Sequence, residues 1–238
     1  CAGGTTGLIP NANKDCSGIC FGNSVIDNCG ICNGSNNCNA TSAFCGYMAF
    51  GPDNDWEEAE NGNMYHNEGP FDLVFDSSPD HWRGDQTSGL RFNGIEVPNN
   101  ALITSAYIQF TTESTVNENP CLLNIDAHLN PDAPLISGDP FDLSSRSRTI
   151  ANVPWAPPDW NYVNESGVAQ STPNLKTVVQ EIVGQPGWTG NNAMVFLIQG
   201  SGGRSAWSFN SDPAKSAKLC ITYSLDTLPP DCNGGPVI

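Results

Sequence analysis

Residues 106–110 read Ala-Tyr-Ile-Gln-Phe, with an apolar residue at every second position, and residues 123–129, Leu-Asn-Ile-Asp-Ala-His-Leu, repeat the pattern. A period of two places alternate side chains on opposite faces, so both segments predict strands with one buried face. Turn signals such as Pro98-Asn99-Asn100 separate further expected strands. These strands are expected at residues 71–76, 90–97, 194–199, 206–210 and 219–224. Many strands with loop-rich connections predict an all-β fold, a β-sandwich or jelly roll.

One segment has the periodicity of a helix instead. Its apolar residues share one stripe, and they are Leu175, Val178, Val179 and Ile182. Thr172 can cap such a helix, Pro173 suits its first position and Gly184 ends it. We therefore expect one short helix, packed over one end of the sandwich.

Composition divides the chain into three parts. Residues 1–45 hold seven of the ten cysteines and little core-forming material, which predicts a disulfide-rich, largely irregular arm. Residues 46–224 contain the predicted strands and form the expected β-sandwich domain. Residues 225–238 are a Pro/Gly-rich tail.

The charge balance excludes several partners. The 238 residues include 9 Lys and Arg against 25 Asp and Glu, for a net charge of −16. Nucleic acid is therefore not an expected partner, because binding to phosphates needs basic residues, and an anionic membrane surface is disfavoured for the same reason. The chain has no run of about 18 apolar residues, so the sequence predicts no membrane span.

The cysteines predict disulfides in an oxidising, extracellular compartment. We expect all ten to be disulfide-bonded: Cys1, Cys16, Cys20, Cys29, Cys32, Cys38, Cys45, Cys121, Cys220 and Cys232. Zinc is the rival interpretation, since Cys29-Gly-Ile-Cys32 could join Cys16 and Cys20. An even number of cysteines favours complete pairing.

Two of these cysteines lie in predicted strands. Cys121 lies two positions before Leu123, so both side chains should point to the core face of the strand. Cys220 directly follows Leu219, so its side chain should point to the opposite, outward face. They could still pair at a strand end. Alternatively, Cys220 could bond to Cys45 and tie the arm to the sandwich.

Three sites fit the Asn-x-Ser/Thr signal for N-linked glycans, at Asn33, Asn39 and Asn164. They agree with secretion, and we expect the chain to be a mature product from which the export signal was removed. Cys1 followed by Ala-Gly-Gly also resembles a processed bacterial lipoprotein, although an acylated Cys1 would leave an odd number of thiols.

An acidic run at residues 53–60, Asp-Asn-Asp-Trp-Glu-Glu-Ala-Glu, is a candidate calcium site. Crowded carboxylates repel unless a cation or water separates them, and calcium prefers oxygen ligands. The candidate ligands are Asp53, Asp55, Glu57 and, from a loop near the last strand, Asp212. The alternative is a solvated acidic loop.

Carbohydrate binding would need exposed aromatic platforms. The main candidates are Trp155, Trp160 and Trp188, and Trp207 and Tyr162 are further candidates. Because Trp155 and Trp160 flank Pro157-Pro158, one face of each ring could be displayed. The alternative is that the same residues plug the end of the sandwich.

Catalysis has little support in the sequence. His66, His81 and His128 are scattered and expected on the surface, and no nucleophile elbow, HExxH motif or P-loop occurs. Acidic residues are plentiful, but no pair is singled out for glycoside hydrolysis. We therefore do not expect an enzyme.

The arm resembles a known extracellular module. Residues 15–36 follow the pattern DCxGxCxGxxxxDxCGxCxGxN, which is found beside thrombospondin type 3-like repeats. The acidic DxDxDG ligand runs of true type 3 repeats are absent. The resemblance therefore implies a disulfide-pinned spacer rather than a calcium-binding repeat.

The sandwich is similar to DNRLRE-type, carbohydrate-binding-module-like jelly rolls of secreted surface and adhesion proteins. The resemblance rests on residues 89–92, Gly-Leu-Arg-Phe, on 101–110, on Trp155 to Trp160 and on Arg204. It implies a jelly roll, and an acidic stretch like that at 53–60 is frequent in the family. Such modules serve adhesion, polysaccharide binding and scaffolding alike.

These observations favour a secreted, glycosylated structural or adhesive protein that builds a fibril or surface appendage. The tail segment Asp231-Cys232-Asn233-Gly234 repeats the opening of the arm motif at residues 15–18, and both chain ends carry a cysteine. We expect head-to-tail self-association, through Cys1 and Cys232 or through an arm segment at 8–10 that adds to a neighbour's sheet edge. The alternatives are a Cys1–Cys232 bond within one chain, and a carbohydrate-binding module of a larger protein with a polysaccharide partner.

Overall fold

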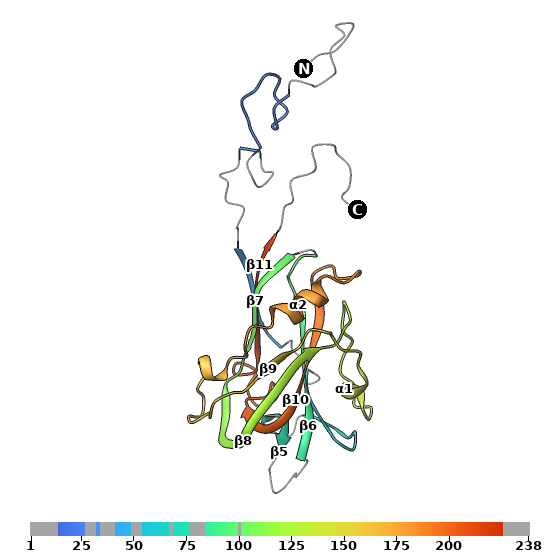
Figure 1. Cartoon of the computed structure of the whole chain (residues 1–238), viewed down its shortest axis with the longest axis vertical. Coiled ribbons are helices and arrows are strands. Elements are labelled where there is room, and N and C mark those ends of the chain that lie inside the picture. The colour runs from blue at the N-terminus through green and yellow to red at the C-terminus, as the bar shows by residue number, and fades with distance from the viewer. Residues whose placement is uncertain are drawn as a thin grey trace. The chain divides into compact units, whose positions relative to one another are not determined.

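The computed structural model in Figure 1 describes residues 14–26, 32–33, 41–48, 54–66, 69–76, 84–99 and 101–225. The chain forms two compact units. One unit comprises Thr41–Ser224, and the other comprises Cys1–Ala40 together with Leu225–Ile238. Within the described residues, no helix is both long enough and apolar enough to cross a membrane.

Antiparallel β-strands dominate the larger unit, which confirms the all-β prediction. Their bounds are β1 Thr41–Tyr47, β2 Asp55–Ala59, β3 Met64–Tyr65, β4 Phe71–Leu73, β5 Phe75–Asp76, β6 Gly84–Ile95, β7 Ala101–Gln109, β8 Thr112–Ala127, β9 Val153–Trp155, β10 Asn192–Ala206 and β11 Lys218–Leu225. The expected strand at 206–210 is wrong, because β10 ends at Ala206 and a turn follows.

The strands form a small and a large sheet with a common core. The small sheet has the order β1-β11-β7, and the large sheet runs β3-β2-β6-β10-β8-β9, with β4 on β10 and β5 on β6 (Figure 1). Alternate side chains of both sheets, including Ile108, Ile125 and Phe196, meet in one buried cluster. This is the sandwich arrangement that the alternating pattern predicts.

Two α-helices interrupt the strands. Helix α2, Lys176–Val183, buries the predicted apolar stripe, but it begins four residues later than Thr172. Helix α1, Asp142–Ser145, was not expected. Its Leu143 is fully buried and packs against Gly89 of β6, where a Cβ would lie 2.6 Å from the leucine side chain. A helix of one turn carries no periodic signal, which explains why the sequence did not reveal it.

The segment that leads into α2 covers the outer edge of β7. Thr172 Oγ1 accepts a hydrogen bond from the Ile108 backbone N–H at 3.0 Å, and Asn174 Oδ1 accepts one from Ala106 at 3.0 Å. Gln180 accepts from Ile103 at 2.8 Å and donates to the Ala101 carbonyl at 3.1 Å. These polar side chains satisfy the backbone groups of an edge strand, which would otherwise attract another strand.

A carboxylate and the Cys16–Cys32 disulfide connect segments of the described part of the arm. Asp15 accepts hydrogen bonds from the Ser17 hydroxyl at 2.7 Å and from the backbone N–H groups of Ile19 and Ser24. These bonds, with that of Ser17 the strongest, lower the pKa of Asp15 to about 2. The Cys16–Cys32 disulfide closes the loop, as a disulfide-pinned arm requires.

Candidate functional site

Strand β2 is the centre of the acidic region, and it is not a solvated loop. All five of its residues are buried, including Asp55, Glu57 and Glu58. Each of these carboxylates accepts backbone hydrogen bonds from a different segment. Asp55 accepts from Phe209 at 2.7 Å, Glu57 accepts from Asp72 at 2.6 Å, and Glu58 accepts from Leu143 and Ser144 at 2.7 and 2.9 Å. The acidic run therefore fastens strand β4, helix α1 and the segment at Phe209 to β2.

The predicted calcium ligands are only partly brought together. The bond from Asp55 to Phe209 places Asp55 beside the turn that leads to Asp212. Asp212 itself pairs with Lys215 at 3.1 Å and accepts a hydrogen bond from Ala214. Asp53 lies outside the described residues. Among the residues that the structure does describe, no group of three Asp, Glu, His or Cys side chains is arranged to hold a metal ion.

Asp55 is the carboxylate most affected by burial. It is 3% exposed, and its Oδ1 has no hydrogen-bond partner among the described residues. Loss of water around the charge raises the pKa of Asp55 to about 6, against the opposing effect of the Phe209 hydrogen bond. Asp55 therefore lies near a change of protonation state at mildly acidic pH.

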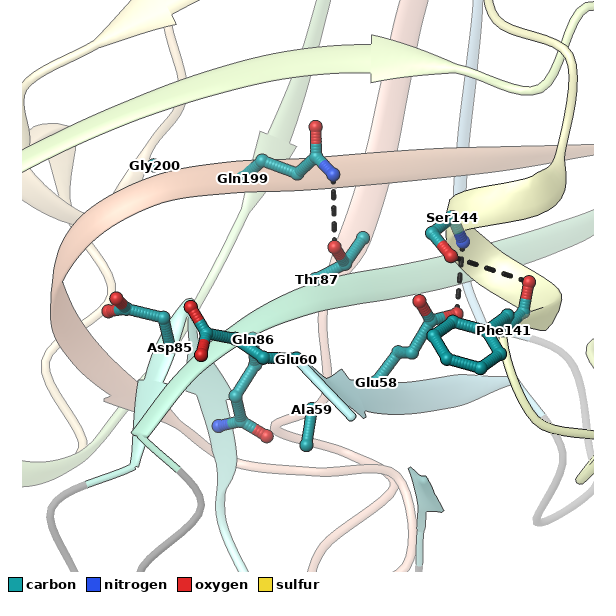
Figure 2. A pocket seen from close by; sticks show the side chains of 10 residues that line it. All are labelled: Glu58, Ala59, Glu60, Asp85, Gln86, Thr87, Phe141, Ser144, Gln199 and Gly200. Atoms are coloured by element: carbon teal, nitrogen blue, oxygen red, sulfur yellow. Dashed lines mark hydrogen bonds between the residues drawn. The ribbon is translucent and has the colours of Figure 1, made fainter. Parts of the chain in front are cut away.

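A shallow pocket of about 290 Å³ lies beside this strand (Figure 2). Its lining includes the carboxylates of Glu58, Glu60 and Asp85, and a hydrogen bond of 3.0 Å joins Gln199 to Thr87 across β10 and β6. Among the described residues that line it there is no Lys, Arg, His or Cys, so this part of the lining can attract a cation.

The three tryptophans predicted as carbohydrate platforms are buried, so the expectation of exposed rings is wrong. Trp160 and Trp188 are fully covered and Trp155 is 6% exposed. The Trp160 indole N–H donates to the Ala169 carbonyl at 3.0 Å, and that of Trp188 donates to Val97 at 2.8 Å. Trp155 stacks on Phe110 with 5.8 Å between ring centroids. The burial of the three rings is what the alternative interpretation requires.

Arg204 organises the loop that carries two of these tryptophans. Its side chain is 2% exposed and donates to the carbonyls of Pro157 and Pro158 at 3.0 and 2.9 Å. It also donates to the side chains of Asn119 and Asp159. In the sequence, Arg204 was noted only among the residues that resemble the jelly-roll family, and no role was predicted for it. A buried arginine whose partners are loop carbonyls leaves no local pattern, so its role could not be predicted.

His128 was expected on the surface and is buried instead. It is 9% exposed, and the Arg146 guanidinium lies 3.2 Å from its Nδ1. Burial and the nearby Arg146 charge lower the pKa of His128 to about 4. Asp142 neutralises Arg146 in a contact of 2.9 Å, so the three residues form a structural network. His66 stacks on Trp56 at 3.9 Å, and His81 lies outside the described residues.

The disulfides resolve one of the open alternatives. Cys45 bonds to Cys220, with 4.2 Å between their Cα atoms, whereas Cys121 is buried and free. The alternation of side chains placed Cys121 in the core correctly, but its inclusion among the bonded cysteines is wrong. Cys20 is also disulfide-bonded. Cys1, Cys29, Cys38 and Cys232 lie outside the described residues.

Two predicted glycosylation sites can be located. Asn33 and Asn164 are both exposed, and Asn39 lies outside the described residues. The Trp207 indole N–H donates to Asn164 Oδ1 at 3.1 Å. That contact engages the oxygen and leaves the amide nitrogen, the atom that would carry a glycan, directed elsewhere.

Comparison of the chain with protein-family models and with curated proteins gives no match in either case. The two resemblances drawn from the sequence therefore remain predictions.

Proposed function

We propose that this chain is a non-catalytic, disulfide-stabilised extracellular subunit that self-associates head to tail into a fibril or surface appendage. The observation that carries the proposal is the free thiol of Cys121. These 238 residues hold ten cysteines, so nine remain when Cys121 is set aside, and nine cannot all pair among themselves. At least one further sulfur is then available for a bond outside these residues, and we propose that another copy supplies its partner.

Two disulfides and two exposed glycosylation signals support an extracellular role. Cys16–Cys32 and Cys45–Cys220 suit an oxidising compartment. Asn33 and Asn164 lie on the surface, where N-linked glycans have room.

The use of the buried polar groups supports a structural rather than a catalytic role. The carboxylates of β2, the Arg204 guanidinium and the three buried tryptophans all bond to backbone groups or pack in the core. Their arrangement strengthens the sandwich and leaves few side chains for chemistry. A folded block that is linked to its neighbours through its arm and its tail meets the needs of a fibril subunit.

Head-to-tail contact uses two different surfaces of each copy. Such heterologous contacts produce an open filament unless the rotation between copies closes a ring. Cys1 and Cys232 are at opposite ends of the sequence and are the proposed link between copies. Calcium at the acidic region would be an additional stabilising partner.

A carbohydrate-binding module is the second candidate. One observation favours it, because Tyr162 is 71% exposed and the neighbouring Val163 is 50% exposed. An exposed aromatic ring can stack on a sugar. A glycan array in which Tyr162→Ala abolishes binding would support this function, and an array without binding would exclude it for the glycans displayed.

The proposed function is tested on native material, alkylated at once and run on SDS gels with and without reductant. We expect a ladder of multiples that collapses to a single band on reduction. A single monomer band under both conditions would contradict covalent linkage. Intact mass of that monomer would then show whether Cys1 carries a lipid, the other use of an unpaired sulfur.

A further inference from the structure

The chain enters and leaves the sandwich at the same point. Strand β1 begins at Thr41, and this residue lies opposite Ser224 near the end of β11. The two strands are antiparallel neighbours in the small sheet, seen as the blue and red strands in Figure 1. Residues before Thr41 and after Ser224 therefore continue from adjacent ends of a single strand pair.

The Cys45–Cys220 disulfide crosses this same pair. Cys45 lies directly opposite Cys220, after four residue pairs that begin with Thr41 and Ser224. The two cysteines are 175 positions apart in sequence, and strands β2 to β10 all lie between them. One covalent bond thus closes nearly the whole sandwich into a loop.

This register determines how the sandwich responds to tension. A pull on the two chain ends separates β1 from β11 at the Thr41 side. Inter-strand hydrogen bonds lie perpendicular to antiparallel strands, so such a pull acts on one residue pair at a time. Without a covalent bond, strands would open in sequence from this end, and the core beneath them would follow.

We propose that Cys45–Cys220 is a mechanical clamp, which carries tension from arm to tail and keeps the rest of the sandwich out of the path of the force. Tension of this kind would arise in a head-to-tail fibre, so the biological use of the clamp rests on the proposed function. The geometry of the clamp does not depend on it, because a single monomer already contains every part.

The clamp sets a limit on extension. Only the four pairs ahead of Cys45 can open while the bond is intact. At about 3.5 Å per residue, these pairs release roughly 30 Å of chain. Opening of the disulfide adds the 175-residue loop, which is roughly 600 Å at the same length per residue.

The bond is accessible to a reductant. Cys45 lies at an exposed position of β1, whereas Cys220 is 8% exposed. A thiolate of dithiothreitol can attack one sulfur and form a mixed disulfide, which releases the other cysteine as a thiolate. The second thiol of dithiothreitol then closes a cyclic disulfide and frees the remaining cysteine. The clamp can therefore be opened in a folded molecule.

Single-molecule pulling on the full chain, tethered at residues 1 and 238, tests the proposal. Every molecule carries Cys232→Ser, so that no bond between arm and tail can bypass the sandwich. We expect no release longer than about 30 Å from the sandwich without reductant, and a release of about 600 Å after dithiothreitol is added. Cys45→Ser/Cys220→Ser should show the long release without reductant.

Cys16→Ser/Cys32→Ser is the matched control. It removes a disulfide that spans 16 positions, so it should add at most about 60 Å and no long release. A long release from the oxidised molecule would overturn the proposal. So would resistance of the reduced molecule at every force that the oxidised molecule withstands.

Reduction of the folded chain gives the answer even where the double variant fails to fold. Failure of the clamp and failure of self-association remain distinguishable, because pulling measures monomers whereas the gels measure multiples.

Discussion

The carboxyl group of Asp55 is buried away from water. We therefore expect the stability of the folded state to depend on the protonation of this residue. Its pKa is about 6 in the folded chain and 3.8 as a reference. The folded state therefore holds the proton more tightly, and the contribution of Asp55 to stability is present below pH 4 and lost as the pH rises through 6.

Asp55→Asn should remove this dependence. In chelator, the free energy of unfolding of the variant minus that of the wild type should rise by about 2 kcal/mol between pH 4 and pH 7. Denaturant titrations across this range measure the difference, in which other titrating groups such as His128 cancel. A difference that stays constant with pH would contradict the raised pKa.

The same residue tests the calcium prediction. A bound cation would favour ionised Asp55, so calcium should raise the melting midpoint at pH 7 in the wild type and not in Asp55→Asn. Glu96→Gln, an exposed acid outside both the predicted ligand set and the pocket lining, is the control and should keep the response. Equal melting midpoints of the wild type in calcium and in chelator would contradict the calcium prediction.

Gln86 illustrates the cost of an unsatisfied amide. It is 5% exposed, and neither polar atom of its side chain has a hydrogen-bond partner in the described part of the chain. Gln86→Met keeps the length and removes this cost, so the free energy of unfolding should rise by about 1 kcal/mol. Gln180→Met, which breaks two bonds to β7, should lower it by about 1–3 kcal/mol. Destabilisation by both variants would show that Gln86 has a water partner.

At the level of elements, the edge of β7 depends on side chains in place of a neighbouring strand. Thr172→Val keeps the shape of the residue but leaves the buried Ile108 N–H without its acceptor. We expect the free energy of unfolding to fall by about 1–3 kcal/mol in denaturant titrations. Thr177→Val, at an exposed position of α2, should change it by less than about 0.5 kcal/mol. Equal effects would indicate that the edge is held by packing alone.

The strands show which elements can be read from a sequence. Alternation located β7 and β8 because each has one face in the core, whereas the predicted part of β10 is a continuous apolar run that is buried on both faces. Strand β2 escaped prediction because its buried residues are mainly acidic, and only tertiary contacts supply the backbone donors that make this possible. Similarly, Thr172 has the sequence of a helix cap but is used as an acceptor for β7.

For the whole molecule, the sequence predicted which way the side chain of Cys121 points, but it did not predict which cysteines pair. Alternation correctly placed Cys121 in the core and left two partners open for Cys220. The choice depended on the position of β1, which begins at Thr41, within the range assigned to the arm. A strand of seven residues beside a cysteine-rich segment is hard to separate from that segment when, as in β1, none of its residues is fully buried.

The sequence predicted where the acidic site lies, but it did not predict what its carboxylates interact with. A crowded set of carboxylates predicts either a cation or a solvated loop, since both relieve repulsion. The structure relieves it in a third way, with backbone N–H groups from three segments. Which donors reach a carboxylate is a property of the tertiary fold, so the sequence alone could not separate these outcomes.

Electron microscopy of the native material, without reductant and at native concentration, tests the central claim most directly. The account predicts filaments whose repeating unit along the axis is a single chain and whose arms and tails join successive sandwiches. Dispersed single particles that bind a polysaccharide but show no end-to-end contact would contradict it, and would favour the carbohydrate-binding module instead.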